Sequence, residues 1–424
     1  MSHSRPSPAG TPDVVVVCQL FHPELISTGQ TLTELVEELV RLGLKITVIA
    51  AQPTVLPGSK RVDSVIYHEG VTIIRTWSTR FPKTNFIGKL FNVSTFFLSA
   101  TWRILVDYRQ PQLLLLTNPP YLPLLGWFMH VLRRQRFGVL LFDIMPEQAE
   151  LIEFIKPNGL VARAWRKLNQ LWYGRAAYAV VLSSDMLEGA LKNANLLGTS
   201  AEAQARAKTH VIHVWSDDRL IQGQPKSASK EAQRLGVENK FVVQYSGNHG
   251  RFHDIESLFR IAQSFQPDEG VVFQFVGEGQ KKKLVNESLK QSPQPHIYSS
   301  SYVPKELLAD SLSMADLGVV AQLPGQERVC YPSKLLGVMA AGRAALAICP
   351  PDCEMARMIR KYELGFVVAN GDIEGGRRVL LEAAANPERV RQMGIRAAEH
   401  LRAHFTLAQA ARGYHSLMTT HARD

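Results

Sequence analysis

Hydrophobic residues form short runs separated by amphipathic stretches along most of the chain. Residues 14–18 are continuously apolar, as in strands that are buried on both faces of a sheet. Residues 30–42 follow with apolar side chains at helical spacing and glutamates on the opposite stripe, and 45–50 form a second apolar run. This order predicts a strand, a helix and a second strand that belong to one parallel sheet.

The alternation recurs, stops in a polar stretch at 222–238, and then starts again. A chain of 424 residues is also too long for one ordinary core. We therefore predict an α/β protein with two Rossmann-like domains in series. The predicted boundaries are a loose tail at 1–12, a first domain at 13–221, a linker at 222–238, a second domain at 239–400, and a C-terminal helix at 401–424 that could pack back on the first domain. The further predicted elements are strands at 113–116, 138–142, 179–182, 211–214, 241–245, 271–276, 317–321 and 344–348, and helices at 255–265, 305–314, 334–341 and within 387–418.

Composition narrows the class of protein. With 46% hydrophobic and 20% charged residues, the chain is globular rather than disordered. Its four cysteines include no Cys-x-x-Cys pair, which argues against a disulfide scaffold and a zinc site. Residues 1–12 are polar and do not resemble a signal peptide, and prolines interrupt the longest apolar run at 113–132. We therefore expect a soluble cytoplasmic chain with no membrane span.

The loops that follow the strands of the second domain are the places to search for a ligand site, because open α/β sheets bind ligands beyond the carboxyl ends of their strands. The loop at 246–254 contains Gly247 and Gly250, whose backbone amides can approach an anion, and Arg251, whose guanidinium suits phosphate. The alternative is a plain glycine-rich turn with a solvated arginine. The net charge of +10 also favours anionic partners.

Two later loops add to this signal. A weak Gly-x-Gly pattern follows the next strand at 277–279, and the lysines at 281–283 indicate a solvated helix start. Pro332 and Ser333 suit a helix N-terminus, where free N–H groups favour anions. Lys334 in the first turn opposes the helix dipole, which is a poor structural choice unless an anion binds there.

Several short motifs also follow one another along nearly the whole chain. They are Phe21-His22-Pro23-Glu24 before Gly29, Asp143-Ile144-Met145-Pro146-Glu147, Trp215-Ser216-Asp217, Tyr245-Ser246-Gly247-Asn248 before Gly250, Phe275-Val276-Gly277-Glu278-Gly279, Ser301-Tyr302-Val303-Pro304, Ala315-Asp316, Pro332-Ser333-Lys334 and Met339-Ala340-Ala341-Gly342-Arg343. Each motif is weak alone, but in this order the chain resembles the retaining glycosyltransferases of the GT-B fold, in the large family 4 of sugar transferases. The resemblance is strongest to members that build polysaccharide or lipid-linked glycans.

The resemblance implies a cleft between the two domains, with the donor held by the second domain and the acceptor by the first. Cationic groups on a diphosphate stabilise the charge of the leaving group, so neither a metal nor a cofactor is expected. No enzyme nucleophile is assigned, and the group that accepts the acceptor's proton stays open. The implied donor-binding residues are Gly29, Gly247, Asn248, Arg251, His253, Gly277, Gly279, Val303, Glu327, Ser333 and Lys334. The implied catalytic residues are Asp143, Glu147, Arg251 and Lys334.

The chain departs from the family pattern in the donor loops. Many members carry two glutamates around the last loop, at positions that align here with Val329 and Gly337. Glu327 lies close by and could substitute for one of them. The usual lysine after the phosphate-binding arginine is also missing, and Phe252-His253 stands near its place. His253 could contact phosphate or merely cap the next helix, so the contacts to the donor sugar stay open.

Residues 70–106 contain basic and aromatic side chains and no acidic residue. Such a mixture suits a surface that rests on anionic lipid headgroups, and a basic cluster at 133–136 could extend it. The alternative is a mostly buried helix with incidental charge. The basic residues are Arg75, Arg80, Lys83, Lys89 and Arg103, and the aromatic ones are Trp77, Phe81, Phe86, Phe91, Phe96, Phe97 and Trp102.

The sequence therefore predicts a retaining glycosyltransferase that moves a sugar from a UDP- or GDP-sugar to a lipid-linked or polysaccharide acceptor. We expect it in the cytoplasm, peripheral at the inner face of the cell membrane, with that anionic surface as a partner. Nucleic acid is not expected as a partner, since the basic residues form no recognisable reader motif. Two alternatives stay open: a nucleotide-sugar epimerase of the same fold, and a non-catalytic, membrane-associated nucleotide-sugar binder.

Overall fold

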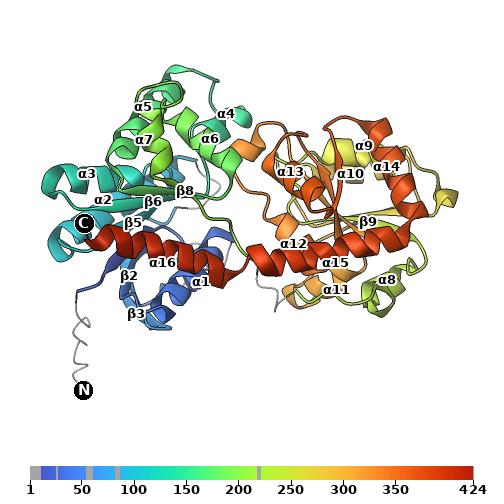
Figure 1. The fold of residues 1–424 in the computed structure, drawn as a ribbon, viewed down its shortest axis with the longest axis horizontal. Coiled ribbons are helices and arrows are strands. Elements are labelled where there is room, and N and C mark those ends of the chain that lie inside the picture. The colour runs from blue at the N-terminus through green and yellow to red at the C-terminus, as the bar shows by residue number, and fades with distance from the viewer. Residues whose placement is uncertain (1–10, 25–26, 54–60, 82–85, 217–220, 424) are drawn as a thin grey trace. The chain divides into compact units, whose positions relative to one another are not determined.

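The computed structural model describes residues 11–24, 27–53, 61–81, 86–216 and 221–423. The chain folds into two compact units, and in Figure 1 the first of them contains both the blue-to-green part of the chain and the red helix α16. The first unit comprises residues 1–213 together with 407–424, and the second comprises 214–406. Each unit is a β-sheet covered by helices.

The first unit is built on an eight-stranded sheet in the order β3-β4-β2-β1-β5-β6-β7-β8. Neighbouring strands are parallel except for β3 and β4, which form an antiparallel hairpin at one edge. The strand order reverses between β1 and β5, which makes this the topological switch point of the sheet. The strands are β1 (Val14–Cys18), β2 (Ile46–Ala51), β3 (Val65–His68), β4 (Val71–Thr76), β5 (Gln112–Leu116), β6 (Phe137–Leu141), β7 (Tyr178–Val181) and β8 (Thr209–Val211).

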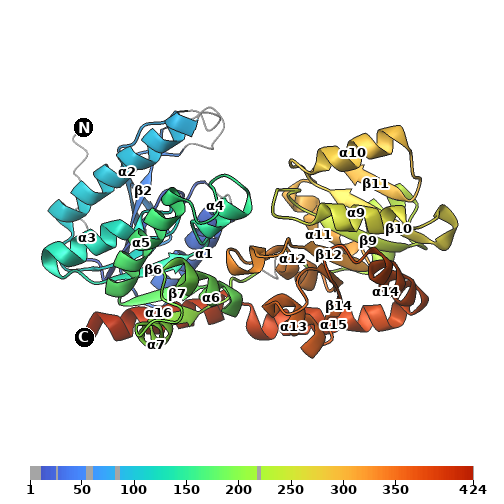
Figure 2. The same ribbon diagram turned by 90° about the horizontal axis from the view of Figure 1, so that it is seen from above.

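Helices cover both faces of this sheet. Helices α2, α3 and α5 lie along one face, whereas α16 lies on the other and packs against α1 (Figure 2). The C-terminal helix therefore belongs to the first unit, although it follows the second unit in sequence. The helices are α1 (Ser27–Arg41), α2 (Phe86–Asp107), α3 (Pro123–Arg133), α4 (Glu147–Leu151), α5 (Leu160–Arg175), α6 (Ser184–Asn193), α7 (Glu202–Ala207) and α16 (Leu407–Arg423).

The second unit has a six-stranded, fully parallel sheet in the order β11-β10-β9-β12-β13-β14. Counted along the chain this is the order 3-2-1-4-5-6 of dinucleotide-binding Rossmann folds, with the switch point between β9 and β12. The strands are β9 (Phe241–Ser246), β10 (Val271–Val276), β11 (Ile297–Ser300), β12 (Leu317–Ala321), β13 (Ala344–Ile348) and β14 (Gly365–Val368). The helices are η2 (Lys226–Ala228), α8 (Lys230–Leu235), α9 (Ile255–Gln263), η3 (Pro267–Glu269), α10 (Lys282–Gln291), η4 (Lys305–Leu307), α11 (Leu308–Ser313), η5 (Gln326–Arg328), α12 (Lys334–Ala340), α13 (Glu354–Lys361), α14 (Ile373–Ala385) and α15 (Pro387–His404).

The polar stretch at 222–238, which the sequence suggests as a linker, belongs to the second unit. The two units divide after His213, and the stretch contains η2 and α8. The side chain of Ser229 caps α8, and the carboxylate of Asp310 accepts hydrogen bonds from the first two backbone amides of that helix. Capped polar helices of this kind carry no apolar stripe that would distinguish them from a linker.

Apolar runs predict the central strands correctly, but the sequence pattern does not predict β3, β4, β11 and β14. Strands β3, β11 and β14 are edge strands with largely half-buried or exposed residues, so their apolar signal is weak. The strand expected at 211–214 is β8, which begins two residues earlier and ends three residues earlier. Asp217 of the Trp-Ser-Asp motif lies outside the described residues. In the described part of the chain, no helix is both long enough and apolar enough to cross a membrane.

Candidate active site

Four loops of the second unit meet the carboxyl edge of its sheet, on both sides of the switch point. They follow β9, β10, β11 and β12, and the last of them leads into α12. Because the strands are parallel, their carboxyl ends share one edge, which is where open α/β sheets bind ligands. The glycine and lysine loops that the sequence singled out in this domain therefore lie on a common edge.

Two glycines bring the loops after β9 and β10 together. Gly247 and Gly277 have φ angles of 132° and 121°, which residues with a side chain rarely adopt. A Cβ on Gly277 would lie 2.0 Å from the carbonyl oxygen of Gly247, and a Cβ on Gly247 would lie 2.6 Å from Cε of Lys334. Both conformation and space thus require glycine here, and Gly247 and Lys334 are direct neighbours.

Lys334 is held in a defined position by His253. The lysine Nζ lies 3.0 Å from Nε2 of His253 and 5.6 Å from the centre of the Tyr245 ring. Nδ1 of His253 donates to the carbonyl oxygen of Ala321 at 3.2 Å, because a carbonyl can only accept. The opposite nitrogen, Nε2, is therefore the acceptor that faces the lysine. The N-cap of α9 is Asp254, so the alternative that His253 caps this helix is wrong.

Burial sets the protonation of this pair. Desolvation lowers the pKa of Lys334 to about 8. Desolvation, followed by the charge of Lys334, lowers the pKa of His253 to about 4. At pH 7 the histidine is neutral and the lysine is mainly charged. A desolvated ammonium group whose neighbours are a histidine lone pair and an aromatic ring is well placed to attract an anion.

Arg251 does not share this buried position. Its side chain is exposed, and Nε donates to Oε1 of Gln280 at 2.5 Å, which joins the loops after β9 and β10. Asn248 and Gly279 lie in the same two loops, and a Cβ on Gly279 would lie 2.7 Å from Oδ1 of Asn248. The structure therefore brings Gly247 and Lys334 together, whereas Arg251 is engaged with Gln280.

Val303 and Ser333 lie beside this group in the remaining loops. Val303 is half-buried after β11 and follows Tyr302, whose ring is 3.2 Å from the position of a Cβ on Gly277. Ser333 is exposed directly before Lys334, and its side chain makes no capping bond to α12. Ser333 thus stands at the N-terminus of α12, as the sequence predicts, and its hydroxyl makes no bond that caps the helix.

Glu327 turns back on its own loop. Its Oε2 accepts a hydrogen bond from the backbone of Gly325 at 2.8 Å, and Oε1 lies 3.8 Å from Nε of Arg328. The carboxylate is thus occupied within η5 and its flanks. This geometry gives no support to Glu327 as a replacement for the missing family glutamates.

Sequence reasoning missed a buried lysine at this edge. Lys282 is only 4% exposed, and its Nζ donates to the carbonyl oxygens of Gly277 and Ser300. These bonds tie together the ends of β10 and β11. The expectation of a solvated helix start at 281–283 is therefore wrong for this residue, because three consecutive lysines do not reveal which one turns inward.

Gln322 is a second residue that no motif marked. It follows β12 directly and is 1% exposed. Its backbone bonds to Ile348 and Asn370, whereas both polar atoms of its side chain have no hydrogen-bond partner among the described residues. An unpaired buried amide is costly, and this one stands next to Ala321, whose carbonyl orients His253. Its amide is thus an unpaired polar group buried behind the same edge.

The part of the chain that the structure describes holds no group of three or more His, Cys, Asp or Glu side chains placed to bind a metal ion. The groups gathered at the carboxyl edge of the second sheet are instead a buried ammonium, a neutral imidazole, an amide and glycine backbone. This set of groups suits an anionic ligand with additional hydrogen-bonding atoms.

In the first unit, Asp143 lies two residues beyond β6. Its Oδ1 accepts a hydrogen bond from Nε2 of Gln148 at 2.9 Å, and its backbone N–H points to Oγ1 of Thr117 at 3.4 Å. Burial raises the pKa of the Asp143 carboxyl group, and the hydrogen bond from Gln148 opposes that rise. A carboxyl group with a raised pKa at the carboxyl edge of a parallel sheet is a candidate for proton exchange with a ligand.

Glu147, the other predicted carboxylate, is engaged within the unit. Its Oε1 lies 2.8 Å from Nζ of Lys192, and its Oε2 accepts from Nδ2 of Asn193 at 2.6 Å. These contacts attach the start of α4 to α6. Its predicted catalytic role stays a prediction, whereas its structural role follows directly from these bonds.

Gly29 lies in the first turn of α1 rather than ahead of the helix. A Cβ at this position would lie 2.6 Å from the carbonyl oxygen of Glu24, so the incoming chain packs directly against the glycine. This contact within the unit already requires a glycine. The predicted approach of Gly29 to a diphosphate stays a prediction.

The segment at 70–106 is less basic at its surface than its sequence suggests. Arg75 is buried and Arg80 half-buried, and both donate hydrogen bonds to backbone carbonyl oxygens. Lys83 lies outside the described residues. Lys89 and Arg103 are exposed on α2. The basic cluster at 133–136 is also partly structural.

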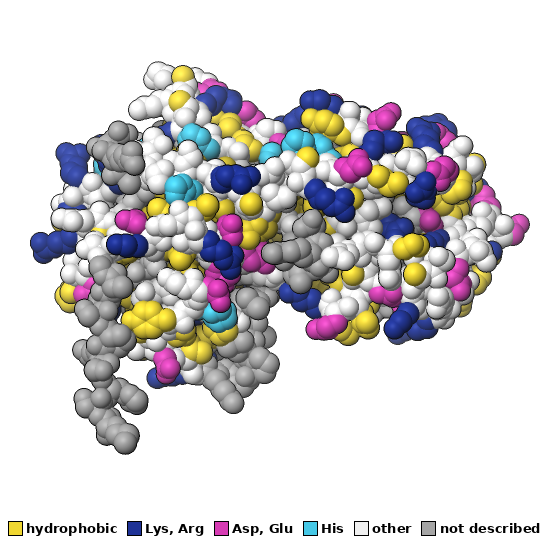
Figure 3. Space-filling model, turned by 60° about the horizontal axis from the view of Figure 1, so that its bottom comes forward, with side chains coloured by type: hydrophobic (Ala, Val, Ile, Leu, Met, Phe, Trp, Pro, Cys, Tyr) yellow, Lys and Arg dark blue, Asp and Glu magenta, His cyan; other side chains and the backbone are white. Residues whose placement is uncertain are grey.

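Arg133 shows this structural use of charge. Its guanidinium donates to the carbonyl oxygens of Ile104, Leu105 and Tyr108 at the end of α2, at 2.9, 3.2 and 2.6 Å. Arg136 similarly donates to the carbonyl oxygen of His421 in α16. On the face drawn in Figure 3, Lys and Arg side chains are interspersed with Asp and Glu, so the net positive charge is not concentrated there.

Helix α2 is not the mostly buried helix of the alternative interpretation. Its outer side presents a row of large apolar side chains to solvent, and each of them is more than half exposed. Contiguous exposed apolar side chains of this kind are typical of interaction surfaces. These residues are Ile87 (63%), Leu90 (52%), Phe91 (55%), Leu98 (67%), Trp102 (70%) and Val106 (57%).

The chain thus has two sheet-based units, and the second has the strand order of a Rossmann fold. Solved structures with the same arrangement confirm this class of fold. Sucrose-phosphate synthase from Thermosynechococcus elongatus has a TM-score of 0.73 at 14% identity, with 96% of this chain and 98% of that chain covered. Anabaena HepE, solved with UDP, has a TM-score of 0.67 at 14% identity, with 96% of this chain and 100% of that chain covered. HepE has also been solved with UDP-glucose. The chain has the GT-B fold, as its sequence predicts.

In sequence, the chain is similar to the Pseudomonas aeruginosa protein named probable glycosyltransferase WbjE. The two are 24% identical over 302 residues, which is 68% of this chain and 70% of that protein. No protein-family model matches the chain. Together, the sequence relative and the structural neighbours support a glycosyltransferase.

Proposed function

We propose that this chain is a retaining glycosyltransferase of family 4 that takes a sugar from a UDP- or GDP-sugar and transfers it to a lipid-linked or polysaccharide acceptor. The fold, the likeness to WbjE and the nucleotide complexes of HepE support a nucleotide-sugar donor. The order of family motifs in the sequence supports the assignment to family 4 and to the retaining class.

One observation carries the proposal: Gly247, Gly277 and Lys334 meet at the switch point of a parallel sheet in Rossmann order. The two glycines allow backbone to approach a ligand closely, and the lysine supplies a desolvated positive charge. A nucleoside diphosphate is the ligand whose charge and shape match this arrangement best, because its phosphates need both backbone amides and a cation.

In this proposal, the bond between the anomeric carbon and the diphosphate oxygen breaks, and the acceptor oxygen bonds to the same face of the sugar while its hydroxyl proton passes to the departing diphosphate. Lys334 stabilises the negative charge that develops on the departing diphosphate, and His253 holds its ammonium in position. Asp143, with its raised pKa, orients the acceptor hydroxyl. No side chain is assigned as a nucleophile.

We place the reaction at the cytoplasmic face of the cell membrane. Support comes from the exposed apolar row on α2 together with the exposed Lys89 on the same helix, whereas the exposed Arg103 is paired with Asp107 at 2.6 Å. Apolar side chains can enter the headgroup region of a bilayer, while cationic ones contact anionic headgroups. The burial of Arg75 and the backbone bonds of Arg80 leave most of this affinity to the apolar side chains.

The test is calorimetric binding of UDP and GDP, and of their glucose and mannose conjugates, to the full chain and to Lys334→Ala. We expect one of the two nucleotides to bind and the variant to bind at least about 100-fold more weakly, because it loses a charge-assisted contact in a desolvated site. Lys290→Ala on α10 is the matched control, since this lysine is exposed in the same unit.

Transfer is then measured with the donor that binds, against lipid-linked and polysaccharide acceptors. Wild-type binding by Lys334→Ala would end the assignment of the donor site. Conversion of the sugar nucleotide without any acceptor would identify an epimerase instead. Binding without turnover on either class of acceptor would support a non-catalytic nucleotide-sugar binder.

A further inference from the structure

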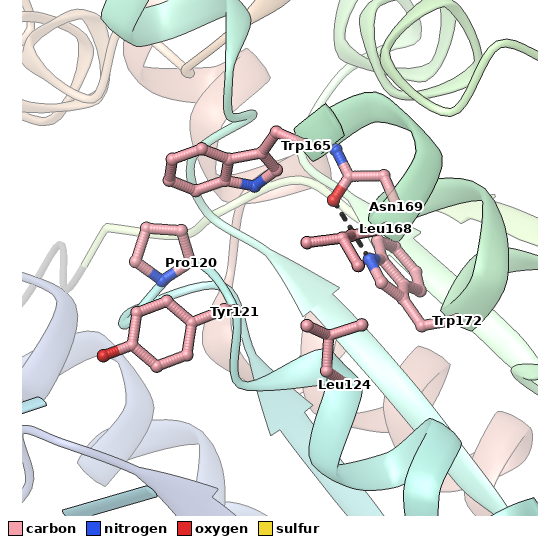
Figure 4. Close-up of a pocket in the computed structure, with 7 residues that line it drawn as sticks. All are labelled: Pro120, Tyr121, Leu124, Trp165, Leu168, Asn169 and Trp172. Carbon is pink, nitrogen blue, oxygen red and sulfur yellow. Dashed lines mark hydrogen bonds between the residues drawn. The ribbon is translucent and has the colours of Figure 1, made fainter. Parts of the chain in front are cut away.

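A small pocket in the first unit lies between the segment that follows β5 and helix α5 (Figure 4). Its volume is about 130 Å³. The side chain of Leu168 is 42% exposed, so the pocket is open to solvent at this side. Apolar and aromatic side chains form its walls: Pro120, Tyr121 and Leu124 on one side, and Trp165, Leu168 and Trp172 on the other.

The amide in the lining is already satisfied by the protein. Nδ2 of Asn169 donates to the carbonyl oxygen of Met145 at 2.8 Å, and its Oδ1 accepts from Nε1 of Trp172 at 3.2 Å. In Figure 4 the hydroxyl of Tyr121 points away from the other labelled side chains, and its ring faces them. Hydrocarbon has no hydrogen bonds to lose on leaving water, so an apolar group suits a pocket lined largely by apolar and aromatic side chains.

The apolar pocket adjoins the carboxyl group that the proposed function uses. A second, smaller pocket is lined by Asp143, and it shares Pro120, Asn169 and Trp172 with the apolar pocket. The two pockets are therefore neighbours, and a chain held in the first lies in the same part of the first unit as Asp143.

Helix α5 extends the apolar wall to the surface and adds positive charge. Leu160, Val161 and Leu171 are 79%, 58% and 44% exposed on it. Arg163 and Lys167 are also exposed, and α5 contains no acidic residue. An acceptor that carries both an aliphatic chain and a phosphate would find complementary groups for each along this helix.

We propose that this pocket binds the first carbon atoms of the aliphatic chain of a phosphate-bearing lipid acceptor. The inference rests on the proposed function and selects the lipid-linked class from its two acceptor classes. The pocket is close in size to an engineered cavity of about 150 Å³ that stays dry and binds benzene, so it accommodates about five or six carbon atoms. The rest of the chain lies along the exposed apolar side of α5.

The probes are decyl phosphate and ethyl phosphate, which share a headgroup and differ in chain length. Their binding is followed by the emission of the full chain, because Trp165 and Trp172 line the pocket. Decyl phosphate is kept below its micellar concentration. We expect it to bind at least about tenfold more tightly than ethyl phosphate, since each buried methylene adds to the affinity.

Two substitutions on the same helix locate the contact. Leu168→Asn, at the pocket, should weaken decyl phosphate binding about fivefold, because it removes apolar area and introduces a polar group. Leu171→Asn is the matched control, since this leucine is equally exposed but does not line the pocket, and it should change the affinity less than about twofold. Urea unfolding of both variants verifies that the unit stays folded.

Equal binding of the two alkyl phosphates, or equal effects of the two substitutions, would overturn the pocket as a chain site. Binding of UDP and GDP is measured on the same samples. Nucleotide binding without chain-length dependence would reject this inference and leave the proposed function intact. Chain-dependent binding without nucleotide binding would reject the proposed function and leave the pocket as a lipid site.

Discussion

The two units share one architecture but distribute their unusual residues in opposite ways. The second unit withdraws a charge from water: Lys334 lies at the carboxyl edge of its sheet, where desolvation lowers its pKa to about 8. The first unit exposes hydrocarbon: Leu98 and Trp102 on α2 and Leu160 on α5 are each more than 60% accessible to solvent. The second unit thus has a charged group at a position shielded from water, and the first unit has apolar groups at positions exposed to water.

Both arrangements oppose the stability of the unit that contains them. A desolvated ammonium group costs free energy unless it gains a partner, and large exposed apolar surfaces favour association. Neither feature is therefore explained by folding alone. Each is explained by a ligand that removes the cost: an anion in the second unit, and an apolar chain or bilayer on the first.

The substitution with the largest expected effect on the second unit is at Gly277. Replacement by Ala places a Cβ 2.0 Å from the carbonyl oxygen of Gly247, which must move the donor loops. We expect nucleotide binding, measured by calorimetry, to weaken by at least about 100-fold. Gly270→Ala is the control, because this glycine also has a positive φ of 75° but no atom within 4 Å of the new methyl group. Unchanged nucleotide binding by the Gly277 variant would contradict this account of the site.

Arg133→Ala tests the scaffold of the first unit. It removes three hydrogen bonds to the end of α2, and leaves carbonyl groups that a charged donor had satisfied. We expect the free energy of unfolding in urea to fall by about 2–3 kcal/mol. Nucleotide binding should not change, because the site lies in the other unit. The exposed neighbour Arg134, changed to Ala, should leave unfolding nearly unaffected, and an equal loss in both variants would argue against the carbonyl contacts.

The pH dependence of donor binding tests whether the positive charge of Lys334 is needed for affinity. Binding of a diphosphate needs the ammonium form of Lys334, whose pKa in the free protein is lowered to about 8. Affinity for the sugar nucleotide should therefore be constant near pH 7 and fall as the pH rises above 8, by up to about tenfold per pH unit. His253, with a pKa of about 4, does not titrate in this range.

Lys334→Arg is the diagnostic variant for this titration. A guanidinium stays charged far above pH 9, so whatever affinity the variant retains should not depend on pH between 7 and 9. Calorimetry across that range makes the comparison. The same slope in both proteins would assign the titration to another group.

Membrane association is expected to show the smallest effect. Trp102→Ser removes one of several exposed apolar side chains of α2, and should weaken co-sedimentation with vesicles of phosphatidylglycerol and phosphatidylcholine by about fivefold. Leu381→Ser, on an exposed leucine of the second unit, should have no effect. Identical losses in the two variants would show that the vesicles do not distinguish the units.

Much of the fold is legible in the sequence, because a strand buried on both faces must be apolar throughout. The apolar run at 14–18 is such a strand, and the return of apolar runs at 241 correctly predicts a second sheet. Edge strands such as β3 and β14 escape this logic, since solvent on one side permits mixed composition. The sequence pattern also misses the polar helix α8, because this helix carries no apolar stripe.

For the candidate site, the sequence by itself determined which loops to examine and which glycines and lysines they contain. Only the tertiary structure decided how those residues are used. In the structure, Lys334 contacts His253, and the buried Lys282 donates to the backbone of Gly277. Arg251 donates to Gln280, and Glu327 accepts from the backbone of its own loop. The physical reason is that burial and hydrogen-bond partners depend on segments far apart in the chain, whereas residue type and local spacing do not.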